Sequence, residues 1–164
     1  MFPRFQFRLR SLFLLMLVLA VPLAWLGQDL QKYRVQRQAL DRLATHQATW
    51  AITAMSRFGF SKVEGLWLTG PVDVDDARHV SELPYLNRLE LHDCQITDDA
   101  WDTIGRIERL TSLHIAYTDM SDEQVLMLKP LKNLRELSLT STGVTEAAVS
   151  ELERALPELR VADD

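Results

Sequence analysis

Polar and apolar residues in the second half of the chain follow a frame that recurs at a nearly constant spacing. The frame opens at Leu86, Leu110 and Leu134, and it places apolar residues at its first, fourth and sixth positions. This alternation predicts a short strand with one buried face. Later in each unit, apolar residues recur three or four positions apart, which predicts a helix.

Units that share this frame are 22 to 24 residues long. They begin near residues 63, 86, 110, 134 and 156, the first being more divergent and the last partial. One strand and one helix cannot bury an apolar face alone, whereas stacked copies bury a continuous core. We therefore predict an α/β fold for residues 63–164, a short solenoid with parallel strands on one face and helices on the other.

Polar residues mark where each helix of these units begins. Ser121 with Gln124 forms a capping box, and Thr97 and Thr145 occupy N-cap positions. The acidic residues that follow are expected in first helical turns, where the helix dipole favours negative charge. These residues are Asp98, Asp99, Asp122, Glu123 and Glu146.

The repeated frame can be written L-x-x-L-x-L-x-x-[CTP], followed by an aliphatic residue and a helix start, as in "LNRLELHDCQITDDA". It resembles the leucine-rich repeat family, specifically its cysteine-containing and ribonuclease-inhibitor-like forms, over about residues 63–161. The chain departs from these forms at the helix starts, where Ala100, Gln124 and Ala147 stand in place of the usual glycine. The resemblance implies a non-catalytic module that binds a protein partner.

An uncharged segment of seventeen residues, Ser11 to Gly27, follows a basic tail at residues 1–10. As a helix it is about 25 Å long, close to the thickness of a bilayer core. We interpret it as a single-pass transmembrane signal anchor. Because a short arginine-rich tail is usually retained in the cytosol, the repeats are expected on the non-cytoplasmic side. The alternative is a cleaved signal peptide and a secreted protein.

Residues 28–62 connect this segment to the repeats. The first part is free of Gly and Pro and rich in helix formers, which predicts a helix that leaves the membrane. We expect its second half, around Trp50, Ile52 and Met55, to cover the open end of the repeats. Residues 28–62 are thus predicted to be a helical connector and N-terminal cap.

Charge is divided unevenly along the chain. Residues 1–60 contain eight Lys or Arg and two Asp or Glu, whereas residues 61–164 contain ten and twenty-one. An acidic repeat region argues against nucleic acid as a partner, because phosphate binding requires a basic surface. The single cysteine, Cys94, excludes an intrachain disulfide and is expected at an inward turn position, shared with Thr118 and Thr142.

Alternation along the strands is expected to align their outward residues in columns across the sheet. The first column is Gly65, Arg88, Ser112, Glu136 and Glu158. The second column is Trp67, Glu90, His114, Ser138 and Arg160. The third column is Thr69, His92, Ala116, Thr140 and Ala162, with Tyr117 just beyond it.

This outward face is the candidate protein-binding surface, because Trp, Tyr and Arg are the residues most often found at interface hot spots. Its candidate residues are Trp67, Arg88, Glu90, His92, His114, Tyr117 and Glu136. A second interpretation is structural: the last strand, near Val161, forms an open edge that another copy of the chain can pair with.

The same face holds residues that suit catalysis or metal binding. Glu90, His114 and Ser138 have the composition of a hydrolase triad, and His92 with Glu90 and His114 has that of a metal site. The backbone N–H groups of a sheet are committed to its ladder, which leaves no oxyanion hole. We therefore predict no catalytic residues, no cofactor and no metal site.

Overall fold

The computed structural model describes residues 9–43, 50–55 and 61–162. Within these ranges the side chains of residues 9–19, 21–26, 50–55 and 61 lie outside the description. The helices are α1 (Leu9–Leu43), α2 (Val74–Glu82), α3 (Asp98–Gly105), α4 (Asp122–Leu126) and α5 (Glu146–Ala155). The strands are β1 (Trp50–Met55), β2 (Ser61–Val72), β3 (Arg88–Ile96), β4 (Ser112–Ala116), β5 (Glu136–Thr140) and β6 (Arg160–Ala162).

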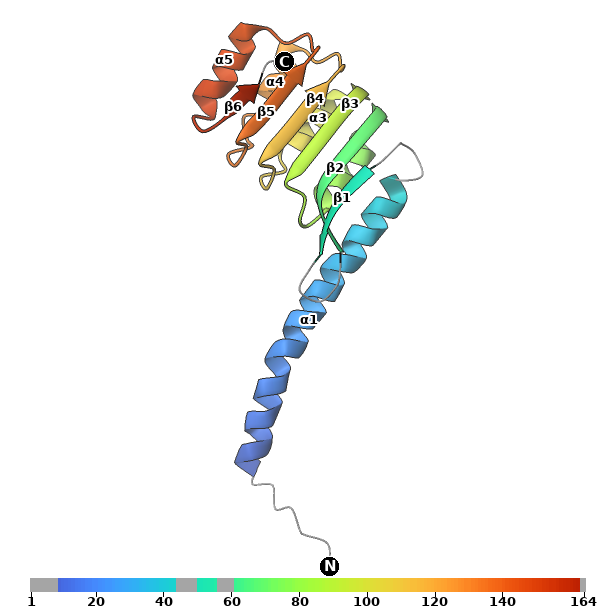
Figure 1. Cartoon of the computed structure of the whole chain (residues 1–164), viewed down its shortest axis with the longest axis vertical. Helices are drawn as coiled ribbons and strands as arrows, with labels where there is room; N and C mark the ends of the chain where they lie inside the picture. The colour runs from blue at the N-terminus through green and yellow to red at the C-terminus, as the bar shows by residue number, and fades with distance from the viewer. Residues whose placement is uncertain (1–8, 44–49, 56–60, 163–164) are drawn as a thin grey trace, which may run out of the picture.

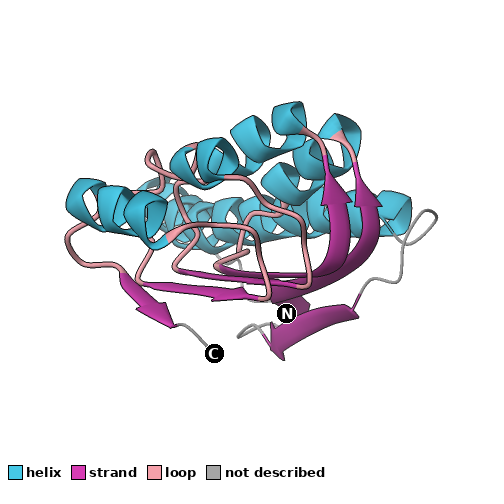
Figure 2. Ribbon diagram, turned by 90° about the horizontal axis from the view of Figure 1, so that it is seen from above, coloured by secondary structure: helices cyan, strands magenta, loops and turns pink. Residues whose placement is uncertain are grey.

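The six strands form one sheet in sequence order, β1 to β6. Strands β2 to β6 are parallel, and β1 is antiparallel to β2. Helices α2 to α5 each connect two parallel strands, and the helices cover one face of the sheet (Figures 1 and 2). The predicted α/β class with a parallel sheet is therefore confirmed.

The core of the described residues lies between the sheet and its helices, and leucine residues supply more than half of its buried side chains. Leu89 and Leu91 of β3 are fully buried, as are Leu86 before the strand and Ile104 of α3. Each fully buried aliphatic side chain stabilises the fold by about 1.5 to 3 kcal/mol relative to an exposed one. The fold depends on stacking, since each strand–helix unit is buried against its neighbours.

Helices α3, α4 and α5 begin at the positions that we predicted from their polar N-cap residues. Thr97, Ser121 and Thr145 are the N-caps of α3, α4 and α5, and Ser121 forms the expected capping box with Gln124. The divergent first unit uses Asp73, which caps α2 and forms a capping box with Asp76.

Acidic residues of the first helical turns also connect adjacent units. The carboxylate of Asp98 accepts a hydrogen bond from Gln124 Nε2 at 2.7 Å. The carboxylate of Asp122 accepts two bonds at 2.8 Å, from the backbone N–H and the hydroxyl of Thr145. Asp98 at the start of α3 and Asp122 at the start of α4 therefore each have a hydrogen-bond partner in the next unit, which gives both carboxylates a structural role.

Helix α1 covers the N-terminal end of the core with its last turns. Ala39 and Leu43 are fully buried, and the buried side chain of Gln36 accepts a hydrogen bond from the N–H of Val63 at 2.9 Å. Helix α1 is therefore joined to the domain by apolar packing and by a buried hydrogen bond to β2. Figure 1 shows the C-terminal part of α1 beside the sheet.

The predicted helix over the second half of the connector is wrong. Residues 50–55 form strand β1, which pairs antiparallel with β2. Trp, Ile and Thr in this segment favour strands, and the pairing covers the edge that β2 would otherwise expose. The segment thus covers the N-terminal end of the repeats as a strand rather than as a helix, and the last turns of α1 cover the core at the same end.

Among the residues whose side chains are described, no helix is long and apolar enough to cross a membrane. Most side chains of the predicted anchor, residues 11–27, lie outside the described ones. The backbone of this segment belongs to the continuous helix α1.

The expected position of the last strand within the columns is also wrong. Arg160 lies beside Glu136, and Ala162 lies beside Ser138, so that the first two columns end two residues later than predicted. The reason is that α5 continues to Ala155, with Leu156 as its C-cap. Leu156 therefore closes a helix rather than opening a strand.

Candidate functional site

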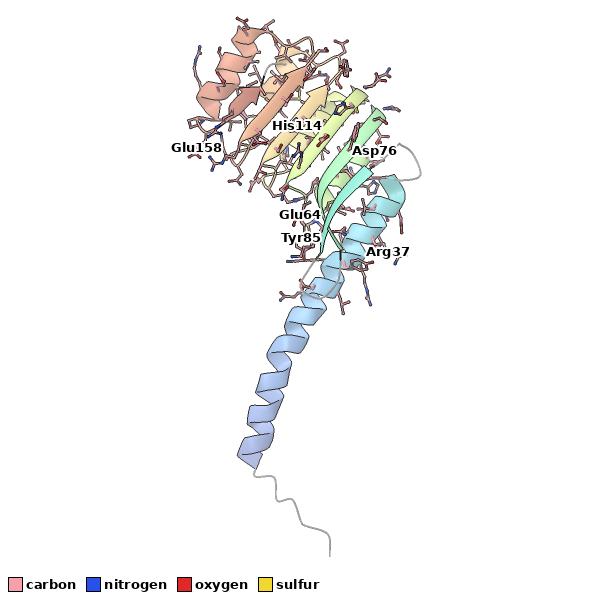
Figure 3. All side chains as sticks on the ribbon, in the orientation of Figure 1. Arg37, Glu64, Asp76, Tyr85, His114 and Glu158 are labelled. Carbon is pink, nitrogen blue, oxygen red and sulfur yellow. The ribbon has the colours of Figure 1, made fainter. Side chains whose placement is uncertain are left out.

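The face of the sheet opposite the helices presents the predicted columns on strands β2 to β5. The first column, Gly65, Arg88, Ser112 and Glu136, is in register across these four strands. The second column, Trp67, Glu90, His114 and Ser138, and the third, Thr69, His92, Ala116 and Thr140, are also in register. His114 lies near the middle of this face (Figure 3).

A polar network centred on Arg88 joins the first two columns. Its guanidinium donates to Glu90 Oε1 at 2.9 Å and lies 3.4 Å from His114 Nε2. The same Nε2 is 3.1 Å from the hydroxyl of Ser112. A guanidinium can only donate, so a hydrogen bond from Arg88 to Nε2 requires this nitrogen to act as the acceptor. This network holds the long Arg88 side chain along the sheet.

The three residues with the composition of a hydrolase triad lie side by side but form hydrogen bonds with other groups. His114 is placed between Glu90 and Ser138 on adjacent strands. Its Nε2 contacts Ser112 and Arg88, while the carboxylate of Glu90 pairs with Arg88. The hydroxyl of Ser138 lies 3.3 Å from that of Thr140. A triad requires a relay from carboxylate to imidazole to hydroxyl, and these bonds run elsewhere.

Three aromatic side chains follow a diagonal across β2, β3 and the end of β4. The rings of Trp67 and His92 contact each other with centroids 4.9 Å apart. Trp67 is 39% exposed and Tyr117 is 65% exposed, the largest value among the large hydrophobic side chains described. Exposed aromatic side chains beside an arginine are typical of protein contact surfaces.

Tyr117 also has an unusual backbone conformation. Its φ is 54°, and Gly70, Asp93 and Ser141 have positive φ at the corresponding positions of the other units. Glycine and Asp adopt this left-handed region readily, whereas for a bulky residue it costs about 1 kcal/mol or more. A large, exposed side chain is thus present at a position where the other units have Gly, Asp or Ser.

Over the part of the chain with described side chains, no three His, Cys, Asp or Glu residues are arranged to hold a metal ion. The grouping of His92 with Glu90 and His114 has a different geometry: the His92 ring packs on Trp67, and Arg88 lies against both other residues.

Cys94 lies near the C-terminal end of β3, and its side chain is buried, as expected from its inward place in the frame. The residue is 4% exposed, and its thiol is 3.4 Å from the carbonyl oxygens of Leu68 and His92. Burial raises the pKa of the Cys94 thiol to about 11. The thiol therefore remains protonated near neutral pH and acts as a small buried group.

We expect Cys94 to react with iodoacetamide at pH 8 roughly a hundredfold more slowly than a solvent-exposed thiol, because only the thiolate is nucleophilic. The rate is measured by mass spectrometry on the folded chain. A matched control is Gln95→Cys in a Cys94→Ala background, since Gln95 is exposed. Equal rates for the two thiols would contradict the buried position of Cys94.

No known protein-family model matches the chain, and no curated protein matches it. The class of protein must therefore be argued from the unit structure and the exposed face.

Two features of this face were missed by the sequence reasoning. The first is that Arg88 reaches two strands and holds both Glu90 and His114. The second is the left-handed conformation of Tyr117. A signal for the second exists, because Asp93, Tyr117 and Ser141 are spaced by 24 residues and Asp is common at such turns.

Proposed function

We propose that the chain is a membrane-anchored leucine-rich repeat protein whose exposed strand face binds a protein partner without catalysis. Residues 11–27 form the anchor in this proposal, with the repeats on the non-cytoplasmic side; secretion after signal cleavage is the alternative. The binding surface consists of Trp67, Arg88, Glu90, His92, His114, Tyr117 and Glu136.

The observation that carries this proposal is Tyr117. It is the most exposed large hydrophobic side chain described, and it is held in a left-handed conformation that glycine would adopt at lower cost. Trp67 and His92 extend the aromatic surface from Tyr117 towards β2, with the Arg88 network alongside. The repeated frame and the unit structure support the family, and the apolar run supports the anchor.

Tyr117→Gly is expected to have opposite effects on stability and binding. The free energy of unfolding should rise by about 1 kcal/mol because the backbone strain is relieved. Affinity for the partner should fall roughly tenfold or more, as for other interface aromatic residues. The partner is first identified by a photo-crosslinking amino acid at Trp67 in native membranes, and its affinity is then measured for each variant.

Arg106→Ala is the matched control, because Arg106 is exposed at the end of α3, on the helix side of the sheet. A partner whose affinity is unchanged by both Tyr117→Gly and Trp67→Ala would refute the choice of face. Loss of stability in Tyr117→Gly would refute the strain argument.

Self-association is the second candidate, and the C-terminal end of the stack favours it. Strand β6 is an edge strand, and a groove of about 550 Å³ beside it is lined in part by Leu139, Val144, Val149 and Val161. Light scattering on the full chain in detergent over a range of concentrations distinguishes the two candidates. A constant monomer mass would refute pairing through this edge.

A further inference from the structure

Helix α1 fixes the distance between the domain and any membrane that residues 11–27 enter. The helix is continuous from Leu9 to Leu43, and Gln36, Ala39 and Leu43 are buried in the domain. At about 1.5 Å per residue, Lys32 lies about 8 Å beyond Gly27 along the helix axis. The headgroup layer of a bilayer is roughly 5 to 8 Å thick on each side, so this turn of α1 lies at its outer boundary.

The part of the domain that meets α1 at this height is the loop before β3. Pro84 of this loop and one face of α1 line a shallow groove of about 340 Å³, together with Gln28, Gln31, Lys32 and Val35. Val35 is 38% exposed. The groove therefore combines apolar surface with amide and ammonium groups at the expected boundary of the membrane.

Two lysines converge on Tyr85, the next residue of the same loop. The ammonium of Lys62 lies 4.6 Å from the centre of the Tyr85 ring, and that of Lys32 lies 5.6 Å from it. Burial raises the Tyr85 pKa, with the neighbouring carboxylate of Asp29 and their hydrogen bond adding to it. The Tyr85 ring thus has two ammonium groups over it and the Asp29 carboxylate at its hydroxyl, and Glu64 lies at the same end of the domain (Figure 3). Tyrosine and lysine side by side are typical of the water boundary of a membrane.

Charge is also separated between the two ends of the parallel strands. Acids collect where the strands end and the helices begin, and the segments 69–77, 92–101, 116–126 and 140–150 contain no Lys or Arg. The loops that lead into β4 and β5 carry charges of both signs, including Glu108, Arg109 and Lys132, and Lys62 lies at the start of β2. Tyr85 lies at the end of the domain nearer the N-terminal half of α1, and Asp76 lies at the other end (Figure 3). The acidic edge thus faces away from the predicted anchor.

The geometry points to a binding site for anionic phospholipid headgroups at the base of the domain, formed by Lys32, Lys62 and Tyr85 beside the Pro84 groove. The inference rests on residues 11–27 spanning the bilayer, as in the proposed function. Lipid phosphates would pair with the two ammonium groups, while the apolar wall at Val35 and Pro84 would lie against the lipid surface. The acidic edge would be held away from the anionic membrane, which orients the exposed strand face.

The test uses the full chain in phosphatidylcholine nanodiscs with a fluorophore on Asn87→Cys, an exposed position at the base of the domain. The label is selective because Cys94 is buried and protonated. Each nanodisc contains a small fraction of either phosphatidylglycerol or phosphatidylcholine with a nitroxide near its headgroup. We expect the labelled phosphatidylglycerol to be enriched roughly tenfold near the fluorophore, as measured by quenching.

Lys32→Gln with Lys62→Gln should abolish this preference, whereas the matched control, Lys129→Gln with Lys132→Gln, should retain it. Equal quenching by both labelled lipids would overturn the lipid site, as would a preference that survives the first pair of substitutions. Flotation of the chain with carbonate-washed vesicles tests the anchor separately. A chain that floats but shows no preference refutes only the lipid site, whereas a chain that does not float refutes the anchor.

Discussion

Trp101→Ala is expected to lower the free energy of unfolding by about 3 to 5 kcal/mol, the cost typical of removing a large aromatic side chain from a core. Trp101 is 1% exposed and has the largest of the fully buried side chains among the described residues. It belongs to α3, between β3 and β4, and fills the space between the sheet and this helix. Since domains of this size are stable by about 5 to 15 kcal/mol, the loss is a large part of the total.

Urea denaturation of the full chain in detergent, followed by circular dichroism, measures this loss. Trp67→Ala is the matched control, because Trp67 is 39% exposed and its truncation leaves no cavity inside the domain. We expect the control to lose less than about 1 kcal/mol, as surface substitutions do. Equal losses for the two variants would contradict the position of Trp101 in the core.

Gly105→Ala is expected to cost about 1 to 3 kcal/mol or more, through overpacking rather than through loss of contacts. A Cβ atom at this position would lie 2.3 Å from the backbone oxygen of Met127 and 3.2 Å from its carbonyl carbon. Gly105 ends α3, and Met127 is the C-cap of the neighbouring helix α4. The clash is with backbone atoms of Met127, so no side-chain rotation can relieve it. The two units must separate to admit one methyl group.

The same substitution in an open helix is the control for helix propensity. A Cβ atom at Gly27 meets nothing within 4 Å, so Gly27→Ala should leave stability unchanged or raise it by up to about 1 kcal/mol. Thermal unfolding of both variants measures the difference. If Gly105→Ala were as stable as the original chain, the close approach of α3 to Met127 would be refuted.

The strand–helix units could be predicted from the sequence because one physical signal repeats. Alternating leucine residues placed β3, β4 and β5, and the N-caps Ser121 and Thr145 placed the starts of α4 and α5. The columns on strands β2 to β5 followed from the same period. Each of these features depends on residues close in sequence, and three similar units reinforce one another.

The features that the sequence did not predict depend on what lies beside a segment in space. Residues 50–55 become a strand because the edge of β2 is available, and their six residues have no repeat to compare with. The last unit was misaligned because Leu156 and Leu159 are both buried. Hydrophobicity alone therefore does not show which of the two leucine residues precedes the last strand. The candidate face was predicted as a set of outward positions, but the reach of Arg88 depends on its side-chain conformation.

Adjacent strands from β3 to β6 pair with the same offset in sequence, so that each unit occupies an equivalent position in the sheet. Arg88, Ser112, Glu136 and Arg160 are each 24 residues apart and lie side by side, and the left-handed residues Asp93, Tyr117 and Ser141 keep the same spacing. Insertion or loss of one whole period would therefore return every later residue to the same face of the sheet. Genetic duplication can lengthen such a chain without redesigning its core, while a one-residue shift of pairing within a strand would turn its buried leucine residues outward.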